Sequence, residues 1–232
     1  MIYLFVAIGI FAITILVMFI LNNNKHLKKD LLYYKSTPLV VTVNNQLSTL
    51  EEYQNIDINF DASYFLFMTN CLLKEVQTAW SHIQLSELSK LVSPNLYEQY
   101  LSTLTEFETK GQKNIITDIL PLSSKLCSLS FINGTTKAEI LLQVSCLDYL
   151  VTNSSHRIIA GSDKNRLAIT YLIQLERTSI PLKHSQAVCS NCKQVIKVDN
   201  LIKCPFCNCE LVPTQYDYIM TEKKVLAEYL LK

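Results

Sequence analysis

The chain has 232 residues, of which 49% are hydrophobic and 18% are charged, and its formal net charge is +1 at pH 7. This balance excludes the strong positive field with which proteins attract nucleic acid through its phosphates. About 150 residues separate an apolar N-terminal run from a cysteine-rich stretch near the end, which is enough chain for one ordinary globular core.

The first 21 residues carry no charged side chain. A helix of that length covers about 30 Å, the thickness of the hydrocarbon core of a bilayer. The basic start and short apolar run of a cleaved signal peptide are absent, so the sequence predicts a retained transmembrane anchor over residues 1–21. Lys25, Lys28 and Lys29 follow this run. By the positive-inside rule, we expect a single-pass membrane protein with its N-terminus outside and its C-terminal domain cytoplasmic.

Residues 22–58 read as a basic collar and a connector with, at most, a short strand. From Asp61 onward, apolar residues recur at helical spacing for about 20 residues, and Asp61 is the expected N-cap. The stretch LSELSKLV predicts a shorter helix. A third helix is expected to begin at Ser93 as N-cap with Pro94 at its first position, and to end at Gly111.

After Gly111 the apolar period changes from 3.6 to 2, which indicates strands. Asn133-Gly134 predicts a two-residue hairpin turn, and residues 166–177 form the clearest alternating strand. Helices followed by long antiparallel strands predict an α+β fold of the cystatin or nuclear-transport-factor type, with the helices on a curved sheet. We assign this domain to residues 59–180, a zinc ribbon with a terminal strand to 185–220, and a C-terminal helix to 221–232.

The cysteine-rich stretch contains two Cys-x-x-Cys pairs, Cys189 with Cys192 and Cys204 with Cys207, and a fifth cysteine at Cys209. Cytosolic thiols are kept reduced, and paired knuckles of this kind in a reducing compartment favour zinc over a disulfide framework. A thioredoxin-type redox site would use one such pair at the start of a helix. The matched spacing predicts Cys189, Cys192, Cys204 and Cys207 as ligands of a structural Zn²⁺, and leaves Cys209 as an ambiguous member.

The segment between the two pairs, KQVIKVDNLIK, alternates around Asp199-Asn200 and predicts a short hairpin. A segment of about 30 residues cannot bury enough core to fold alone, so metal binding would supply its folding energy. The other three cysteines fall in apolar patterns and are interpreted as small buried residues; they are Cys71, Cys127 and Cys146.

The run FLFMTNCLLKEVQTAWSHIQLSELSKLVSPNLYEQYLSTLTEFETKGQKNII resembles the C-terminal domain of mitochondrial import inner membrane translocase subunit 44. The features that carry the resemblance are an apolar helix ending in AW, a Leu-spaced turn, an S..LY motif and a closing Gly-x-x-Asn. It extends over about residues 60–220, and bacterial members with a zinc ribbon and a terminal YDW segment are the most similar, matched here by QYDYIM. Lys193 and Asn208 stand where the knuckles of the family often have glycine.

The resemblance implies a non-enzymatic binding protein at the cytoplasmic face of the membrane, with the anionic leaflet and an unidentified protein as partners. It does not extend to chaperone tethering, because the chain lacks room for the long region that performs it. No small-molecule substrate is expected. An enzyme or small-ligand binder built on His82, Asp148, Tyr149 or Tyr171 is one alternative. Ribosome or nucleic-acid contact through the ribbon is another, weakened by a single net positive charge over residues 189–210.

Overall fold

The structure is a computed structural model, and it describes residues 29–58, 60–177, 187–189, 191–196, 203–209 and 216–231. The predicted anchor over residues 1–21 lies outside these ranges, as do Lys25 and Lys28. Among the helices in the described ranges, none has the length and apolar character needed to cross a membrane. The chain divides into two compact units, Met1–Thr37 and Pro38–Lys232, and the first contributes the helical residues 29–36.

The second unit contains four described helices. They are α2 (Leu50–Ile56), α3 (Ala62–Ser81), α4 (Leu85–Leu91) and α5 (Pro94–Thr109). The predicted caps are confirmed: the Asp61 carboxylate accepts from the Tyr64 N–H at 2.7 Å, and the Ser93 hydroxyl accepts from the Leu96 N–H at 3.3 Å. Helix α2, which the connector interpretation missed, begins with a capping box.

The strands form one large sheet and one small one. The large sheet contains β1 (Val40–Val43), β2 (Gln46–Ser48), β3 (Gln112–Ile132), β4 (Thr135–Thr152), β5 (Ile158–Gly161), β6 (Leu167–Arg177) and β9 (Ile219–Leu230). Their order is β2-β1-β3-β4-β6-β9, with β5 paired to β4, and β1 to β3 is the parallel pair. Asn133 and Gly134 both have positive φ and connect β3 to β4, which confirms the predicted hairpin.

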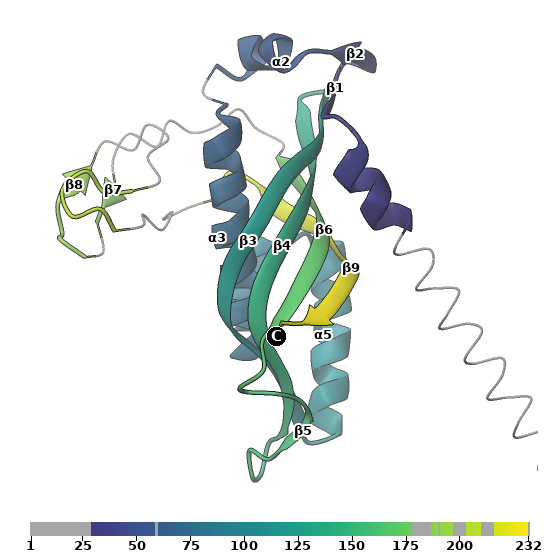
Figure 1. Cartoon of the computed structure of the whole chain (residues 1–232), viewed down its shortest axis with the longest axis vertical. Helices are drawn as coiled ribbons and strands as arrows, with labels where there is room; N and C mark the ends of the chain where they lie inside the picture. The colour runs from purple at the N-terminus through teal and green to yellow at the C-terminus, as the bar shows by residue number, and fades with distance from the viewer. Residues whose placement is uncertain are drawn as a thin grey trace, which may run out of the picture. The chain divides into compact units, whose positions relative to one another are not determined.

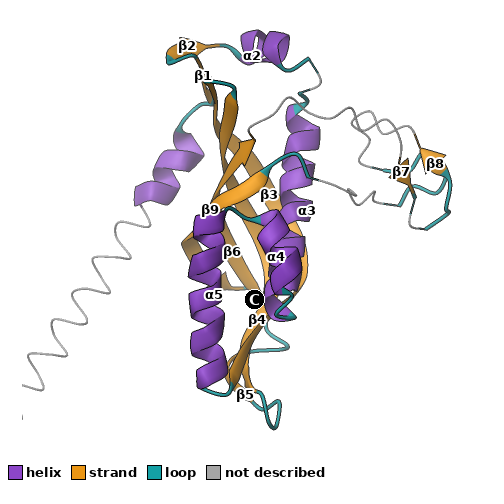
Figure 2. Cartoon of the chain, turned by 180° about the vertical axis from the view of Figure 1, so that it is seen from behind, coloured by secondary structure: helices purple, strands orange, loops and turns teal. Residues whose placement is uncertain are grey.

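The long strands curl together, and α3, α4 and α5 cover one face of the resulting half-barrel (Figures 1 and 2). The core lies between these helices and the sheet. Its fully buried side chains include Leu72 and Leu88 from the helices and Ile140, Leu142 and Ile173 from the strands. The predicted α+β class, with helices on one face of a curved and mainly antiparallel sheet, is confirmed.

The predicted C-terminal helix over residues 221–232 is wrong, because this segment is strand β9, which pairs with β6 from Glu176↔Ile219 to Leu167↔Leu230. The pairing satisfies the backbone groups on the side of the segment that faces β6, and Met220 and Leu226 are buried. The good helix formers in its sequence are thereby overridden by tertiary structure.

The connector interpretation of residues 22–58 also requires correction, because β1 pairs in parallel with β3 and Tyr53 of α2 is fully buried. The sheet domain therefore includes residues before position 59. The cysteine ribbon is an insertion between the neighbouring strands β6 and β9. Its small sheet pairs β7 (Ala187–Val188) with β8 (Val195–Ile196). Asp199 and Asn200, where a hairpin was predicted, lie outside the described residues.

Candidate metal centre and polar clusters of the sheet

Two turns of the same shape carry the four predicted ligands. In the first, the Cys189 N–H donates to the Gln194 carbonyl at 2.9 Å, and the Lys193 N–H donates to the Cys189 carbonyl at 3.0 Å. In the second, the Cys204 N–H donates to the Cys209 carbonyl at 2.9 Å, and the Asn208 N–H donates to the Cys204 carbonyl at 2.8 Å. The two turns therefore repeat one set of backbone hydrogen bonds around their cysteines.

Both turns need a residue in the left-handed region at the position after the second cysteine. Lys193 has φ 60° and Asn208 has φ 58°. Asparagine visits this region more readily than other non-glycine residues, whereas lysine does so at a cost. The departure from glycine noted in the sequence thus leaves the geometry of both knuckles intact.

The four predicted ligands come together. The Sγ atoms of Cys189, Cys192, Cys204 and Cys207 all lie within 4.8 Å of one another, and this set could hold a metal ion. Cys189 and Cys204 are buried, while Cys192 and Cys207 are partly exposed. The side chain of Ile196, from β8, is buried beside them. A four-thiol set of this size matches the closed tetrahedral sites in which thiolates bind metal.

Cys209 also lies against this cluster. Its Sγ is 3.2 Å from that of Cys189 and 3.3 Å from that of Cys207. Its position follows from the second knuckle, because its carbonyl accepts the hydrogen bond from the Cys204 N–H. The exclusion of Cys209 from the ligand set therefore stays a prediction, and its thiol is near enough to serve as a substitute.

The thiols of the cluster differ in acidity. The backbone N–H of Cys209, and next the side chain of Asn191, lower the pKa of Cys207 to about 5. The neighbouring sulfurs of Cys189 and Cys207 raise the pKa of Cys209 to about 12, because they favour its protonated form. Hydrogen bonds from the backbone therefore favour a thiolate at Cys207 and at Cys189, and a thiolate is the form that binds metal. Against the hydrogen bond from the Gln194 backbone, burial and the neighbouring sulfurs raise the pKa of Cys192 to about 12.

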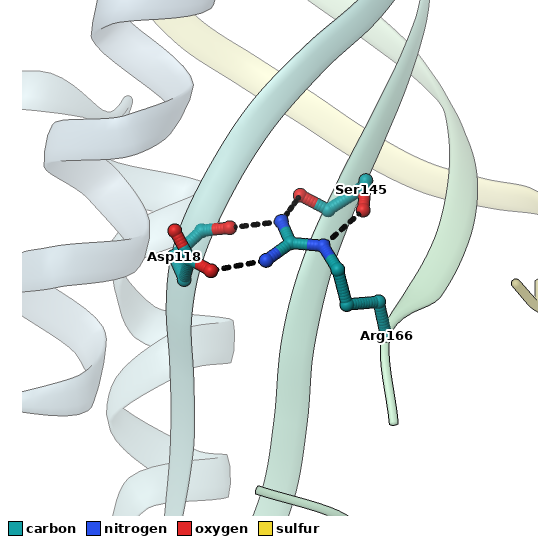
Figure 3. A network of polar contacts seen from close by, with 3 residues as sticks. All are labelled: Asp118, Ser145 and Arg166. Carbon is teal, nitrogen blue, oxygen red and sulfur yellow. Dashed lines mark hydrogen bonds and ion pairs between the residues drawn. The ribbon is translucent and has the colours of Figure 1, made fainter. Parts of the chain in front are cut away.

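A second polar cluster lies on the sheet and joins Asp118, Ser145 and Arg166 (Figure 3). Arg166 Nε donates to the Ser145 hydroxyl at 2.6 Å and Nη2 donates to the Ser145 carbonyl at 3.0 Å, while Nη1 forms an ion pair with the Asp118 carboxylate. Asp118 has φ 52° and lies at a register shift between β3 and β4. Since all three guanidinium nitrogens are engaged, this cluster fixes the bulge in β3 and leaves no nitrogen for a ligand.

The structure brings together only two of the four residues of the alternative enzyme hypothesis, Asp148 and Tyr171. His82 is exposed at the C-terminal end of α3, and its Nδ1 lies 2.9 Å from the Thr78 carbonyl. Tyr149 follows Asp148 on β4, so the side chains of Tyr149 and Asp148 point to opposite faces of the sheet. Asp148 and Tyr171 lie on the face covered by helices. The Asp148 carboxylate accepts from Asn114 Nδ2 at 2.8 Å.

Lys223 was missed by the sequence interpretation, which placed it on a helix. On β9 its Nζ lies 5.3 Å from the centroid of the Tyr100 ring and 5.5 Å from that of the Tyr171 ring. Had the segment been recognised as a strand paired with β6, the alternation of side chains along it would have placed Lys223 on the same face as its partner Ile173.

A buried ion pair closes the base of the cysteine insertion. Arg177 Nη2 lies 2.6 Å from the Asp57 carboxylate, and the two side chains are 6% and 5% exposed. The Arg177 guanidinium also stacks over the Tyr218 ring at 4.6 Å. Arg177 ends β6 and Tyr218 precedes β9, so the two strands are tied together where the insertion leaves the sheet and returns to it.

Comparison with known proteins agrees with the resemblance seen in the sequence. The family model described as Tim44-like domain matches residues 46–187, which is more than half of the chain. The match begins at β2 and ends at β7, before the first of the clustered cysteines. A search of curated proteins gives no match. Because the family model covers α2 to β6, the chain belongs to the Tim44-like domain family.

Proposed function

We propose that this chain is a membrane-anchored, non-enzymatic binding protein of the Tim44-like family, stabilised in part by a structural zinc ribbon. The observation that carries the proposal is the set of four clustered thiols, held in two like knuckles and inserted between two strands of a Tim44-like sheet. Its function is to present the sheet domain and the ribbon to a protein partner at the cytoplasmic face of the membrane.

The arrangement of the sulfurs supports zinc over redox chemistry. Close sulfur distances join different knuckles: Cys192 to Cys204 is 3.6 Å, and Cys189 to Cys207 is 3.7 Å. A redox-active pair would exchange electrons within one Cys-x-x-Cys, whereas a shared metal draws ligands from both. Four soft thiolates in a closed set favour Zn²⁺, which takes no part in redox chemistry.

The proposed role of zinc is structural. The described sulfurs leave no place for a water or substrate in a four-thiolate shell, and catalytic zinc sites usually keep one position open. When bound, the ion would supply the folding energy of the ribbon, because Ile196 is the one large apolar side chain buried in the cysteine core among the ribbon residues that the structure describes. Backbone hydrogen bonds at both knuckles orient the thiols for this purpose.

Metal analysis of the full-length chain under reducing conditions tests the zinc assignment. We expect about one equivalent of Zn²⁺, lost on Cys207→Ser and retained on Cys209→Ser. Less than about half an equivalent in the unaltered chain would overturn the zinc ribbon. Retention after Cys207→Ser together with loss after Cys209→Ser would instead show that Cys209 is the fourth ligand.

A further inference from the structure

Lys223 occupies an unusual place for a lysine. It pairs with Ile173, whose side chain is fully buried beneath the helices, so Lys223 points toward the same covered face. There its ammonium is flanked by the ring of Tyr100 from α5 and that of Tyr171 from β6. Lys224, the next residue, points to the opposite face and is exposed, which makes it a natural internal control.

The groups around Lys223 form a connected polar cluster. Asp148 and Cys146, which lie on β4, are the residues whose charges act on the Lys223 amine. Trp80 Nε1 donates to Asn114 Oδ1 at 2.9 Å, and Asn114 Nδ2 in turn donates to Asp148, so the carboxyl is held in place. The remaining ionisable groups facing this region are Tyr100, Tyr171 and Glu228.

One donor of the cluster has no partner. The Tyr100 hydroxyl is buried and makes no hydrogen bond within the part of the chain that the structure describes. A buried hydroxyl without a partner costs about 1 to 3 kcal/mol, so a ligand that accepts its hydrogen bond would recover that energy. Solvent nevertheless reaches this end of the face, because Val225, which pairs with Tyr171, is 41% exposed.

The chemistry of the amine follows from its surroundings. Lys223 is partly buried, and its removal from water lowers its pKa to about 8, while Asp148 and Cys146 oppose the shift by favouring the ammonium. At pH 7 about a tenth of such amines are unprotonated, against fewer than about one in a thousand for an ordinary lysine. The unprotonated amine is the nucleophile in reactions of lysine with carbonyl compounds.

We propose that Lys223 is the anchor of a site for a small planar aldehyde or ketone, held as a reversible imine. An anionic ligand is disfavoured because the carboxyls of Asp148 and Glu228 face the same region. The rings of Trp80, Tyr100 and Tyr171 suit a flat apolar molecule. This inference goes beyond the proposed function and does not depend on the zinc ribbon.

The reaction balances without an oxidant or reductant. The lone pair of Lys223 Nζ attacks the carbonyl carbon and forms the C–N bond, and the carbonyl oxygen takes up a proton. Loss of that oxygen as water, with the second proton of the amine, gives C=N. In this proposal the Tyr100 hydroxyl donates to the carbonyl oxygen, because it has no hydrogen-bond partner among the described residues and its ring lies beside Nζ. Water reverses every step.

The test uses the full-length chain with benzaldehyde at equal molarity and cyanoborohydride at pH 7, which reduces any imine to a stable secondary amine. Peptide mapping by mass spectrometry then compares Lys223 with Lys224. We expect at least about tenfold more adduct on Lys223, because more of its amine is unprotonated. Raising the pH from 6 to 9 should increase the initial rate of labelling at Lys223 through a midpoint near its pKa of about 8.

Three variants extend the test. Lys223→Arg keeps a cation between the rings and should lose the adduct, whereas Lys224→Arg should keep it. Tyr100→Phe keeps the ring and should slow labelling about tenfold or more, because it removes the proton donor. Equal labelling of Lys223 and Lys224 in the unaltered chain would overturn the proposal even if a variant fails to fold. An unchanged rate in folded Tyr100→Phe would remove Tyr100 from the site.

Discussion

At the scale of single residues, the two knuckles differ at one position. Lys193 and Asn208 adopt the same left-handed backbone, with φ 60° and 58°, but only asparagine is commonly found there. Glycine has no Cβ to hinder this conformation, and forcing another residue into it costs about 1 kcal/mol or somewhat more. The first knuckle therefore carries a local backbone strain, which would weaken the binding of the proposed metal ion.

Lys193→Gly should relieve that strain. Because metal binding and folding of the ribbon are coupled, a gain of about 1 kcal/mol would appear as roughly fivefold tighter zinc binding. Competition with a chromophoric chelator measures the affinity. Asn208→Gly is the matched control and should change it less. Weaker binding after Lys193→Gly would show that the lysine side chain contributes a favourable contact.

Asp57 and Arg177 illustrate a different cost at the residue scale. Both side chains are almost fully buried, and their ion pair is 2.6 Å long. Asp57→Ala would leave the guanidinium buried without its counter-charge, which should lower the free energy of unfolding by about 3 kcal/mol. Urea denaturation followed by circular dichroism measures this loss.

The exposed ion pair between Glu87 and Lys90 provides the control, because its side chains are 55% and 66% exposed. Glu87→Gln should change the free energy of unfolding by no more than about 0.5 kcal/mol. A similar small effect of Asp57→Ala would contradict the importance of the buried pair at the base of the insertion.

At the scale of elements, local signals in the sequence were reliable where one residue decides the backbone. Asp61 and Ser93 cap α3 and α5 as expected, and Asn133-Gly134 turns the chain between β3 and β4. Strand β9 could not be predicted this way. Its residues are mostly helix formers, and its conformation depends on pairing with β6, whose last residue lies more than 40 positions earlier.

The candidate sites, like the elements, could be predicted where neighbouring residues decide the geometry and not where distant segments meet. The four cysteines could be paired from their spacing alone, because two residues between ligands fit one knuckle. The closeness of Cys209 depends on a backbone hydrogen bond to Cys204, which spacing does not reveal. The cluster around Lys223 joins α3, α5, β3, β4, β6 and β9, so predicting it required the strand order of the sheet. The parallel pairing of β1 with β3 could not be predicted for the same reason.

The insertion of the ribbon between β6 and β9 predicts that the sheet domain is stable without it. Replacing residues 178–215 with a short Gly-Ser turn should keep a cooperative thermal transition within about 4 °C of the unaltered chain. The reason is that the β6–β9 pairing and the contact between Arg177 and Tyr218 remain. Differential scanning calorimetry measures the transition.

Replacing residues 177–218 in the same way is the matched control, since this excision also deletes the contact between Arg177 and Tyr218 at the point where the insertion leaves the sheet. This version should melt at a clearly lower temperature. Loss of a cooperative transition after the shorter excision would show that the ribbon is part of the folding unit of the sheet.

At the scale of the whole molecule, the Tim44-like sheet domain, the cysteine insertion and the apolar N-terminal run are three parts with different physical roles. The sheet domain has a large core of its own, with its helices on one face. Within its described residues, 187–189, 191–196 and 203–209, the insertion has a small cluster of cysteines around Ile196. From this division we expect that removing metal would affect the ribbon before the sheet domain.

The uncharged run over residues 1–21 and the lysines that follow it predict how the whole chain behaves with membranes. We expect the full-length chain to stay in the membrane pellet after an alkaline carbonate wash, because about 20 apolar residues suffice to span the hydrocarbon core. Changing Lys25, Lys28 and Lys29 together to glutamine should leave that result unchanged. It should loosen the orientation, since positive charges beside a span favour the cytoplasmic side and each contributes about 1 kcal/mol near an anionic leaflet. Protease protection of sealed vesicles reports the orientation. Recovery of the unaltered chain in the carbonate supernatant would refute the anchor, whereas an unchanged orientation in the triple variant would refute only the role of the lysines.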